Sequence, residues 1–154
     1  MAAVNGGLRV AIELAQRRRD AAATDLARAR AGEAAAQHQL DQLESYAGET
    51  DGRWTQQSQV LASPELLQTH YQFMARLYQA MDMQRNVMRQ HVQQVAQRIE
   101  ALRAAELRLG SLQKVVARHQ LEAERLQLRR EQKEVDEFAS HQARRTAAAR
   151  EADA

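Results

Sequence analysis

The feature that most constrains this chain is a heptad repeat that begins directly behind its only proline. Ser63-Pro64-Glu65 is a helix-start signal. The serine hydroxyl can cap free backbone N–H groups, the proline φ suits a first helical position, and the carboxylate lies near the positive end of the helix dipole. Apolar residues then recur at alternating steps of four and three. The predicted seam of this helix is Leu67, Tyr71, Met74, Tyr78, Met81, Met88, Val92, Val95, Ile99, Leu102 and Leu109, interrupted by Arg85 and Glu106. Such a sustained repeat predicts a coiled coil rather than a globular core.

A second heptad pattern precedes this one, in a single register from about residue 8 to residue 47. One row is Leu8, Ala15, Ala22, Ala29, Ala36 and Leu43; the other is Ile12, Arg19, Leu26, Glu33, Leu40 and Ala47. Because the first row is mostly alanine, the helix can approach a partner closely while burying little area per contact. Gly48, Thr50, Asp51 and Gly52 are turn formers that break the pattern.

These patterns predict an all-α fold, an antiparallel two-helix coiled-coil hairpin with a longer second helix. We expect a single domain over residues 1–154: helix 1 at about 8–47, a turn at 48–63, helix 2 at about 64–145, and a frayed tail. A short connection places the helices side by side and antiparallel. Helix 1 would then pair with roughly residues 64–105 and leave the rest of helix 2 without an intramolecular partner. Ala, Arg, Gln, Glu and Leu dominate the composition, and these residues favour helix.

The residues give little support to catalysis, metal binding or nucleic-acid binding. The five histidines include no pair at the i, i+4 spacing of a helical metal site, and cysteine is absent. The carboxylates have arginines within a turn, which predicts surface ion pairs. A two-helix hairpin also lacks a water-excluding pocket. We therefore expect a non-enzymatic protein without a cofactor or metal.

Charge and hydropathy also limit the kinds of partner and the location that we expect for this protein. The net charge is only +2, from 22 basic and 20 acidic side chains. The longest basic run, Arg17-Arg18-Arg19, is interpreted as a solvated helix turn, because no aromatic stacking platform lies near it. No nucleic acid is expected. Met1 to Val10 lacks a signal-type apolar run and no stretch is long enough to span a bilayer, so we expect a cytoplasmic protein.

An off-seam stripe on helix 2 is the most informative feature for function. Phe73, Leu77, Ala80 and Gln84 are spaced by four, three and four residues, and Gln39 and Tyr46 take outer positions of helix 1. One interpretation is that Phe73 and Leu77 widen the intramolecular seam or pack under the Trp54 segment. The other is an exposed apolar and aromatic patch that docks on a partner.

Three segments resemble the FliJ family of the bacterial flagellar type III export apparatus. They are Leu40-Asp-Gln-Leu-Glu-Ser-Tyr46, His70-Tyr-Gln-Phe-Met-Ala-Arg-Leu77 and, most specifically, Glu131-Gln-Lys-Glu-Val-Asp-Glu-Phe-Ala139. The resemblance covers nearly the whole chain. It implies an antiparallel two-helix stalk, like that of rotary ATPases, which binds the hexameric export ATPase, links it to the membrane export gate and handles export chaperones. It also implies a location in the cytoplasm, peripheral to the flagellar base at the inner membrane.

The resemblance implies a gate-facing surface formed by Gln39, Leu43, Tyr46, Phe73, Leu77 and Ala80. Thr50 and Gln84 depart from the aromatic and the histidine expected of the family. For the ATPase ring no motif transfers. We expect its contact at the free end of the hairpin, at Leu8, Ile12, Arg19, Leu112, Val116 and Phe138.

Other assignments remain open at this stage. The equivalent stalk of a virulence type III secretion system has the same architecture, and a generic dimeric coiled-coil scaffold would pair its unpartnered helix ends with each other. A basic nucleic-acid-binding rod is a further alternative, which would bind with a steep salt dependence.

Overall fold

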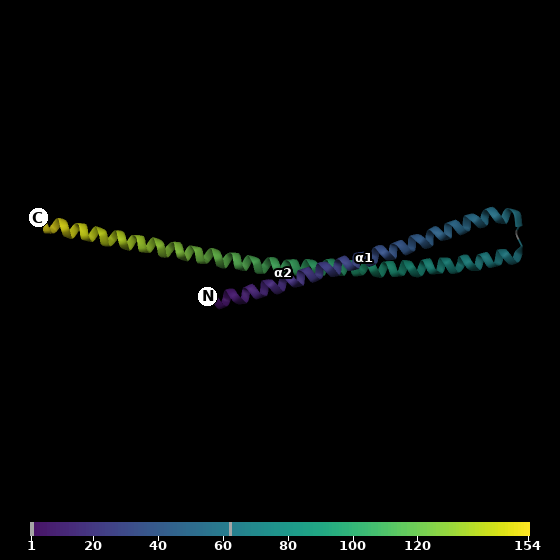
Figure 1. Ribbon diagram of the computed structural model, residues 1–154, viewed down its shortest axis with the longest axis horizontal. Coiled ribbons are helices and arrows are strands. Elements are labelled where there is room, and N and C mark those ends of the chain that lie inside the picture. Colours follow the sequence, from purple (N-terminus) through teal and green to yellow (C-terminus); the bar gives the residue numbers. More distant parts are fainter. Residues whose placement is uncertain (1, 62) are drawn as a thin grey trace. The chain divides into compact units, whose positions relative to one another are not determined.

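A computed structural model describes residues 2–61 and 63–154, with side chains for residues 6–57 and 63–154. It contains two helices, α1 (Ala2–Leu61) and α2 (Pro64–Ala152), which Figure 1 shows as the two long coils of the chain. Helix α1 has 60 residues and α2 has 89. The prediction of an all-α hairpin with a longer second helix is confirmed.

The chain divides into two compact units. The hairpin unit is Leu14–Leu107, and the terminal unit combines the residues up to Glu13 with Arg108–Ala154. Within the hairpin unit the helices are antiparallel, because contacts pair rising numbers on α1 with falling numbers on α2. Asp25 meets Arg98, Gln39 meets Gln84, and Tyr46 meets Phe73. Whether residues 1–154 fold as a single domain stays a prediction.

The start of α2 follows the sequence signal. The Leu66 backbone N–H donates to the Ser63 hydroxyl oxygen at 3.2 Å, and the Leu67 N–H donates to the Ser63 carbonyl at 3.1 Å. Pro64 is the first helical residue, where its missing N–H costs no hydrogen bond. Ser63 therefore caps α2 as predicted.

The predicted turn at 48–63 is wrong over most of its length, because α1 continues to Leu61. Gly48 and Gly52 lie inside the helix, and no described glycine has a positive φ. Thr50 and Trp54 are half-buried and follow Leu43 and Ala47 at heptad spacing. The seam therefore runs on through the glycines, and packing along it outweighs their low helix propensity. Ala62 lies outside the described residues.

The outer helix ends also extend further than predicted. Helix α1 begins at Ala2 rather than near residue 8, and α2 continues to Ala152 without the frayed tail. Alanine and arginine are strong helix formers. In α2, side-chain hydrogen bonds one turn apart add support: Gln127 Nε2 to Glu131 at 3.3 Å and Gln132 Nε2 to Asp136 at 3.0 Å.

Burial confirms the predicted register of α1. Every residue of the two predicted rows is buried or half-buried, and Ala15, Leu26, Ala36, Leu40 and Ala47 are the most enclosed. Small alanines on α1 face the partner helix, so the two backbones can approach closely.

In α2 one predicted row is right from Met74 onward, whereas its first member, Leu67, is exposed. The other row is displaced by one residue as far as Val92, and Ile99 is half-buried as predicted. The row of Met74, Met81, Met88, Val95, Leu102 and Leu109 is buried or half-buried. Tyr71, Tyr78, Arg85 and Val92 are exposed, and the residues that precede them face α1 instead: His70, Leu77, Gln84 and His91.

The polar members of the displaced row are accommodated by particular partners on α1. His70 stacks on Trp54, and the Gln84 amide donates to the Ala36 carbonyl at 2.9 Å. His91 packs against Gly32, where a Cβ would lie 3.1 Å from the imidazole. Gly32 therefore makes room for a histidine in the seam. The hydrophobic core of the hairpin unit lies between these polar layers, with Leu40, Ala47, Met74, Leu77 and Met81 at its centre.

Candidate partner-binding surfaces

The corrected register defines two edges along the seam of the hairpin unit. Residues just before the Leu40, Ala47, Met74 and Met81 positions form one edge, which we call the aromatic rim: Gln39, Tyr46, Phe73 and Ala80. Residues just after the Leu43, His70, Leu77 and Gln84 positions form the other edge, which we call the mixed rim: Glu44, Tyr71, Tyr78 and Arg85. At the edges of an antiparallel coiled coil, residues at the same heptad position on the two helices lie opposite each other. The contacts of Tyr46 with Phe73 and of Glu44 with Arg85 agree with this assignment.

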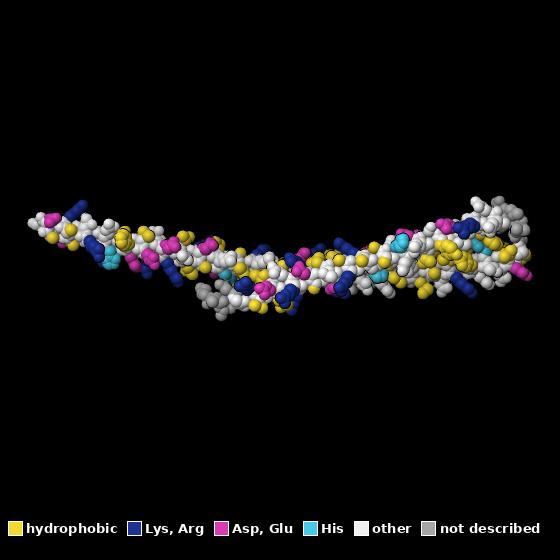
Figure 2. Space-filling view, viewed as in Figure 1, with side chains coloured by type: hydrophobic (Ala, Val, Ile, Leu, Met, Phe, Trp, Pro, Cys, Tyr) yellow, Lys and Arg dark blue, Asp and Glu magenta, His cyan; other side chains and the backbone are white. Residues whose placement is uncertain are grey.

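The aromatic rim carries no charged side chain and is built on an aromatic pair. The Tyr46 and Phe73 rings meet edge to face, with centroids 6.2 Å apart at 81°. Aromatic pairs favour this geometry, which fixes both rings without removing them from solvent. Tyr46 is 50% exposed and Phe73 is 41% exposed. Figure 2 shows hydrophobic side chains gathered where the helices of the hairpin unit pair near their connection.

A hydrogen bond extends the aromatic rim toward Gln39. The Gln84 amide nitrogen, 2.9 Å from the Ala36 carbonyl, also donates to Gln39 Oε1 at 3.1 Å. This bond ties the Gln39 amide to α2 across the seam, and Ala80, one turn before Gln84 on α2, is half-buried. The rim is thus an uncharged surface whose side chains are held by contacts across the seam.

The mixed rim combines charge with exposed tyrosines. Arg85 lies 3.5 Å from Glu44 across the helices and 2.9 Å from Asp82 on its own helix. Tyr71 and Tyr78 are exposed beside it. The two rims therefore differ in chemistry, because the four residues of the aromatic rim are uncharged and the mixed rim carries the Arg85–Glu44 ion pair.

The predicted gate-facing residues separate into core and surface. Leu77 is only 8% exposed and belongs to the core, and Leu43 packs against that core. The interpretation that Phe73 and Leu77 widen the intramolecular seam therefore holds for Leu77, whereas Phe73 contacts Tyr46 of α1 and stays 41% exposed. Gln39, Tyr46, Phe73 and Ala80 lie together on the aromatic rim, and Phe73 remains available to a partner.

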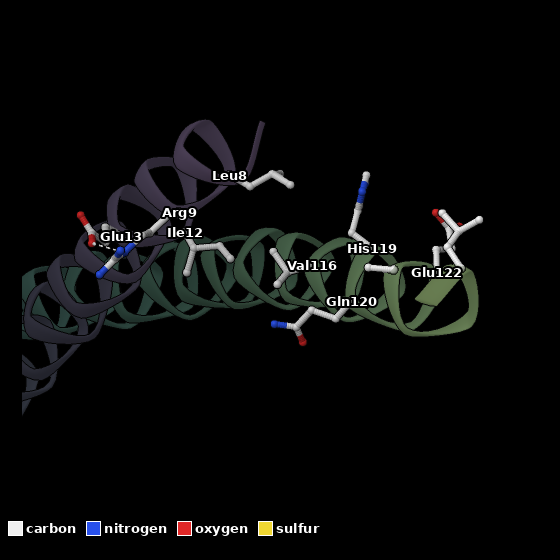
Figure 3. A pocket seen from close by; sticks show the side chains of 10 residues that line it. Leu8, Arg9, Ile12, Glu13, Val116, His119, Gln120 and Glu122 are labelled. Carbon is white, nitrogen blue, oxygen red and sulfur yellow. Dashed lines mark ion pairs between the residues drawn. The ribbon is translucent and has the colours of Figure 1, made fainter. Parts of the chain in front are cut away.

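The terminal unit holds an apolar groove between the start of α1 and α2. Leu8 and Ile12 of α1 line it with Val116, Ala123 and Leu126 of α2, around a volume of about 470 Å³. Figure 3 shows Ile12 reaching toward α2 beside Val116. The polar margin consists of the Arg9–Glu13 ion pair at 3.9 Å, together with His119, Gln120 and Glu122.

The residues predicted to contact the ATPase ring are only partly brought together. Leu8, Ile12 and Val116 line the same groove, and Leu112 is half-buried on α2. Phe138 is exposed and lines a separate hollow with His141, Gln142 and Arg145. Arg19 belongs to the hairpin unit, where its guanidinium contacts Asp20 at 2.9 Å.

Two features of the surface were missed by the sequence reasoning. The exposed Tyr71 and Tyr78 fit the four-and-three spacing of the predicted seam, although this spacing also fits an edge position. The stacked contact of Trp54 with His70 was hidden because the segment around Trp54 was interpreted as part of a turn. Thr50 and Trp54 follow Leu43 and Ala47 by seven residues each, and this spacing is the sequence signal that leads to the contact.

No group of three or more His, Asp or Glu side chains in the described residues is arranged to hold a metal ion. None of the helices in this part of the chain has a stretch of the length and apolarity needed to cross a membrane.

Comparison with known proteins places this hairpin in a family. Residues 7–148 match the family described as "Flagellar FliJ protein". No curated protein and no solved structure matches the chain. The match covers both helices and both compact units, and the antiparallel hairpin agrees with it. The chain belongs to the FliJ family and is a flagellar export-associated protein.

Proposed function

We propose that this protein is a non-enzymatic stalk and adaptor of the flagellar type III export apparatus. It binds the hexameric export ATPase, connects that ATPase to the cytoplasmic part of the export gate, and handles export chaperones. It acts from the cytoplasm, peripheral to the inner membrane at the flagellar base. Membership of the FliJ family supports this assignment, and the aromatic rim is the observation that carries it for this chain.

The aromatic rim suits a gate contact for a physical reason. Interface hot spots are enriched in aromatic side chains that are already ordered before binding. Tyr46 and Phe73 meet this condition because each ring fixes the other. Gln39 adds a hydrogen-bonding group, and the absence of charge on the rim lowers the cost of desolvation. Leu43 and Leu77 contribute indirectly, by supporting the rim from the core.

The terminal unit supports the ATPase contact. From residue 121 onward every described α2 residue is exposed, and Leu121, Leu128, Val135 and Phe138 lie on this stretch. Exposed apolar side chains in this number favour a protein partner. The groove of Leu8, Ile12 and Val116 continues that surface within the same unit.

The same exposed stretch is also the observation that favours the second candidate, a dimeric coiled-coil scaffold. The assay that separates the two is ATP hydrolysis by the cognate export ATPase, with and without this protein, combined with light scattering of the protein alone. Stimulation of hydrolysis together with a monomeric mass supports the stalk. No stimulation together with a stable dimer supports the scaffold and contradicts the stalk.

Two variants and a control locate the ATPase contact within the chain. Phe138→Ala and Leu128→Ala remove exposed apolar side chains and are expected to weaken stimulation while leaving helical content unchanged. Tyr78→Ala, on the mixed rim of the hairpin unit, is the control and is expected to leave stimulation at the wild-type level. The virulence-system alternative is tested by repeating the assay with a virulence export ATPase.

A further inference from the structure

The mixed rim of the hairpin unit presents two largely exposed tyrosines. Tyr71 is 65% exposed and Tyr78 is 50% exposed. Because they are seven residues apart on α2, both lie on one edge of the seam, roughly 10 Å apart along the helix axis. Large aromatic side chains left in solvent at this spacing indicate a contact surface along one side of the hairpin.

Four exposed carboxylates surround these tyrosines: Asp41, Glu44 and Asp51 on α1, and Asp82 on α2. Glu44 and Asp51 are seven residues apart on the α1 side of the mixed rim. Asp41 and Asp82 lie one turn from rim positions. Asp51 also lies 3.7 Å from His70 Nε2, yet 61% of its side chain stays exposed. The carboxylates are therefore accessible to a partner.

Arg85 is the arginine of the mixed rim, and carboxylates already match its charge. Its guanidinium lies 3.5 Å from Glu44 and 2.9 Å from Asp82. The other arginines of these turns, Arg53 and Arg76, do not fall on heptad positions of this rim. The mixed rim therefore places a net negative charge beside its two phenol rings.

This combination selects a basic helix as its partner. A phenol face attracts lysine and arginine side chains through cation–π contacts, and a nearby carboxylate adds a charge-assisted hydrogen bond. Residues seven apart on one helix match residues seven apart on a helix that packs alongside, as in a coiled coil. A third helix laid along the rim would therefore meet both tyrosines with a single stripe of side chains. The carboxylates would repel an acidic segment in the same position.

We propose that the mixed rim docks a basic amphipathic helix of a partner protein. The two tyrosines pack against the apolar stripe of this helix, and the surrounding carboxylates pair with lysine or arginine side chains that flank the stripe. The aromatic rim lies on the other edge of the same seam, so both rims can be occupied at once. The proposal concerns a surface that the proposed function does not use, and its test needs neither the export gate nor the ATPase.

A defined peptide tests the chemistry of the surface. The probe is a synthetic amphipathic helix of about 18 residues, built from alanine, leucine and arginine, and its partner is the full-length protein. A second peptide with glutamate in place of every arginine is the charge control. Calorimetry at about 0.05 M and about 0.3 M salt measures both affinities. We expect the arginine peptide to bind at least about tenfold more tightly than the glutamate peptide, with a smaller preference at the higher salt.

Matched variants locate the contact. The double variant Tyr71→Ala/Tyr78→Ala should bind the arginine peptide about tenfold more weakly or worse, and Glu44→Gln about threefold more weakly. Phe73→Ala, on the aromatic rim, and Glu100→Gln, at an exposed carboxylate elsewhere on α2, should change its Kd by less than about twofold. Glu100→Gln makes the same charge change as Glu44→Gln, so it separates general electrostatic attraction from the rim. Circular dichroism establishes that each variant is folded.

Equal affinity for the two peptides would overturn the proposal. Wild-type affinity in the double tyrosine variant, or equal losses in Glu44→Gln and Glu100→Gln, would also overturn it. Light scattering of the protein alone tests a second copy of the chain as the occupant. A wild-type dimer that the double tyrosine variant abolishes would show that a second copy covers the rim, and would contradict the proposal. A monomeric wild type that binds the arginine peptide through the tyrosines supports it.

Discussion

Replacing Gly48 and Gly52 by alanine should stabilise this protein. Both glycines lie inside α1, on exposed positions where an added Cβ meets nothing within 4 Å. Neither has a positive φ, so alanine fits the backbone without strain. In a helix interior alanine is about 1 kcal/mol more favourable than glycine. The double variant is therefore expected to gain about 2 kcal/mol in the free energy of unfolding.

The size of this gain can be measured by thermal and urea unfolding. For a chain of this length, about 2 kcal/mol corresponds to a rise of roughly 4–8 °C in melting temperature. Circular dichroism at 222 nm follows both transitions, and an unchanged urea m-value shows that the compactness of the end states is the same. Gly110→Ala is a suitable control, since an added Cβ there also meets nothing within 4 Å.

The competing description predicts the opposite sign. If Gly48 instead ended a helix in the left-handed conformation, as the predicted turn at 48–63 implies, Gly48→Ala would lower the free energy of unfolding by about 1 kcal/mol. A fall in melting temperature of Gly48→Ala, with Gly110→Ala stabilised, would refute the continuous helix through residues 48–61.

Two pairs of substitutions test the register and the packing of the seam. Leu77→Ala should destabilise the protein by about 2–5 kcal/mol because it empties a core position. Tyr78→Ala changes the next residue, on the mixed rim, and should cost less than about 1 kcal/mol. Equal losses of unfolding free energy in urea would contradict the register. Gly32→Ala should gain less than Gly48→Ala, because its Cβ would lie 3.1 Å from the His91 imidazole, and the missing gain should return in a His91→Ala background. A double-mutant cycle that shows no coupling would contradict this contact.

The sequence predicts most of the fold because heptad spacing is a strong signal. The α1 register could be assigned from Leu8 to Ala47 because Leu8, Ile12, Leu26, Leu40 and Leu43 all fall in one heptad register. The cap at Ser63 was also predictable, because it depends on three adjacent residues alone. In both cases local chemistry and tertiary packing favour the same structure.

The second row of α2 could not be predicted from apolar spacing, because three of its members are polar. His70 and Gln84 take seam positions beside particular partners on α1, whereas His91 fits there because Gly32 leaves room for its ring. Spacing alone favours the larger neighbours Tyr71 and Tyr78. Which of two adjacent residues faces the seam is thus decided by contacts with a helix distant in sequence.

The same limit applies to the candidate gate surface. The family resemblance selected Gln39, Tyr46, Phe73 and Ala80, which the hairpin brings to one edge. It also selected Leu77, whose burial depends on the register of α2. The lengths of both helices were underestimated for a related reason. Glycine and terminal composition suggested breaks where the seam and strong helix propensity sustain the helix.

In the proposed function, the aromatic rim is the surface that meets the export gate. Its most direct test is the affinity of this protein for the purified cytoplasmic part of the gate protein, measured by calorimetry. Phe73→Ala removes an exposed ring and is expected to weaken binding by about tenfold or more. Tyr78→Ala, of similar exposure on the mixed rim, is expected to change the Kd by less than about twofold. Wild-type affinity in Phe73→Ala, or an equal loss in Tyr78→Ala, would contradict the claim.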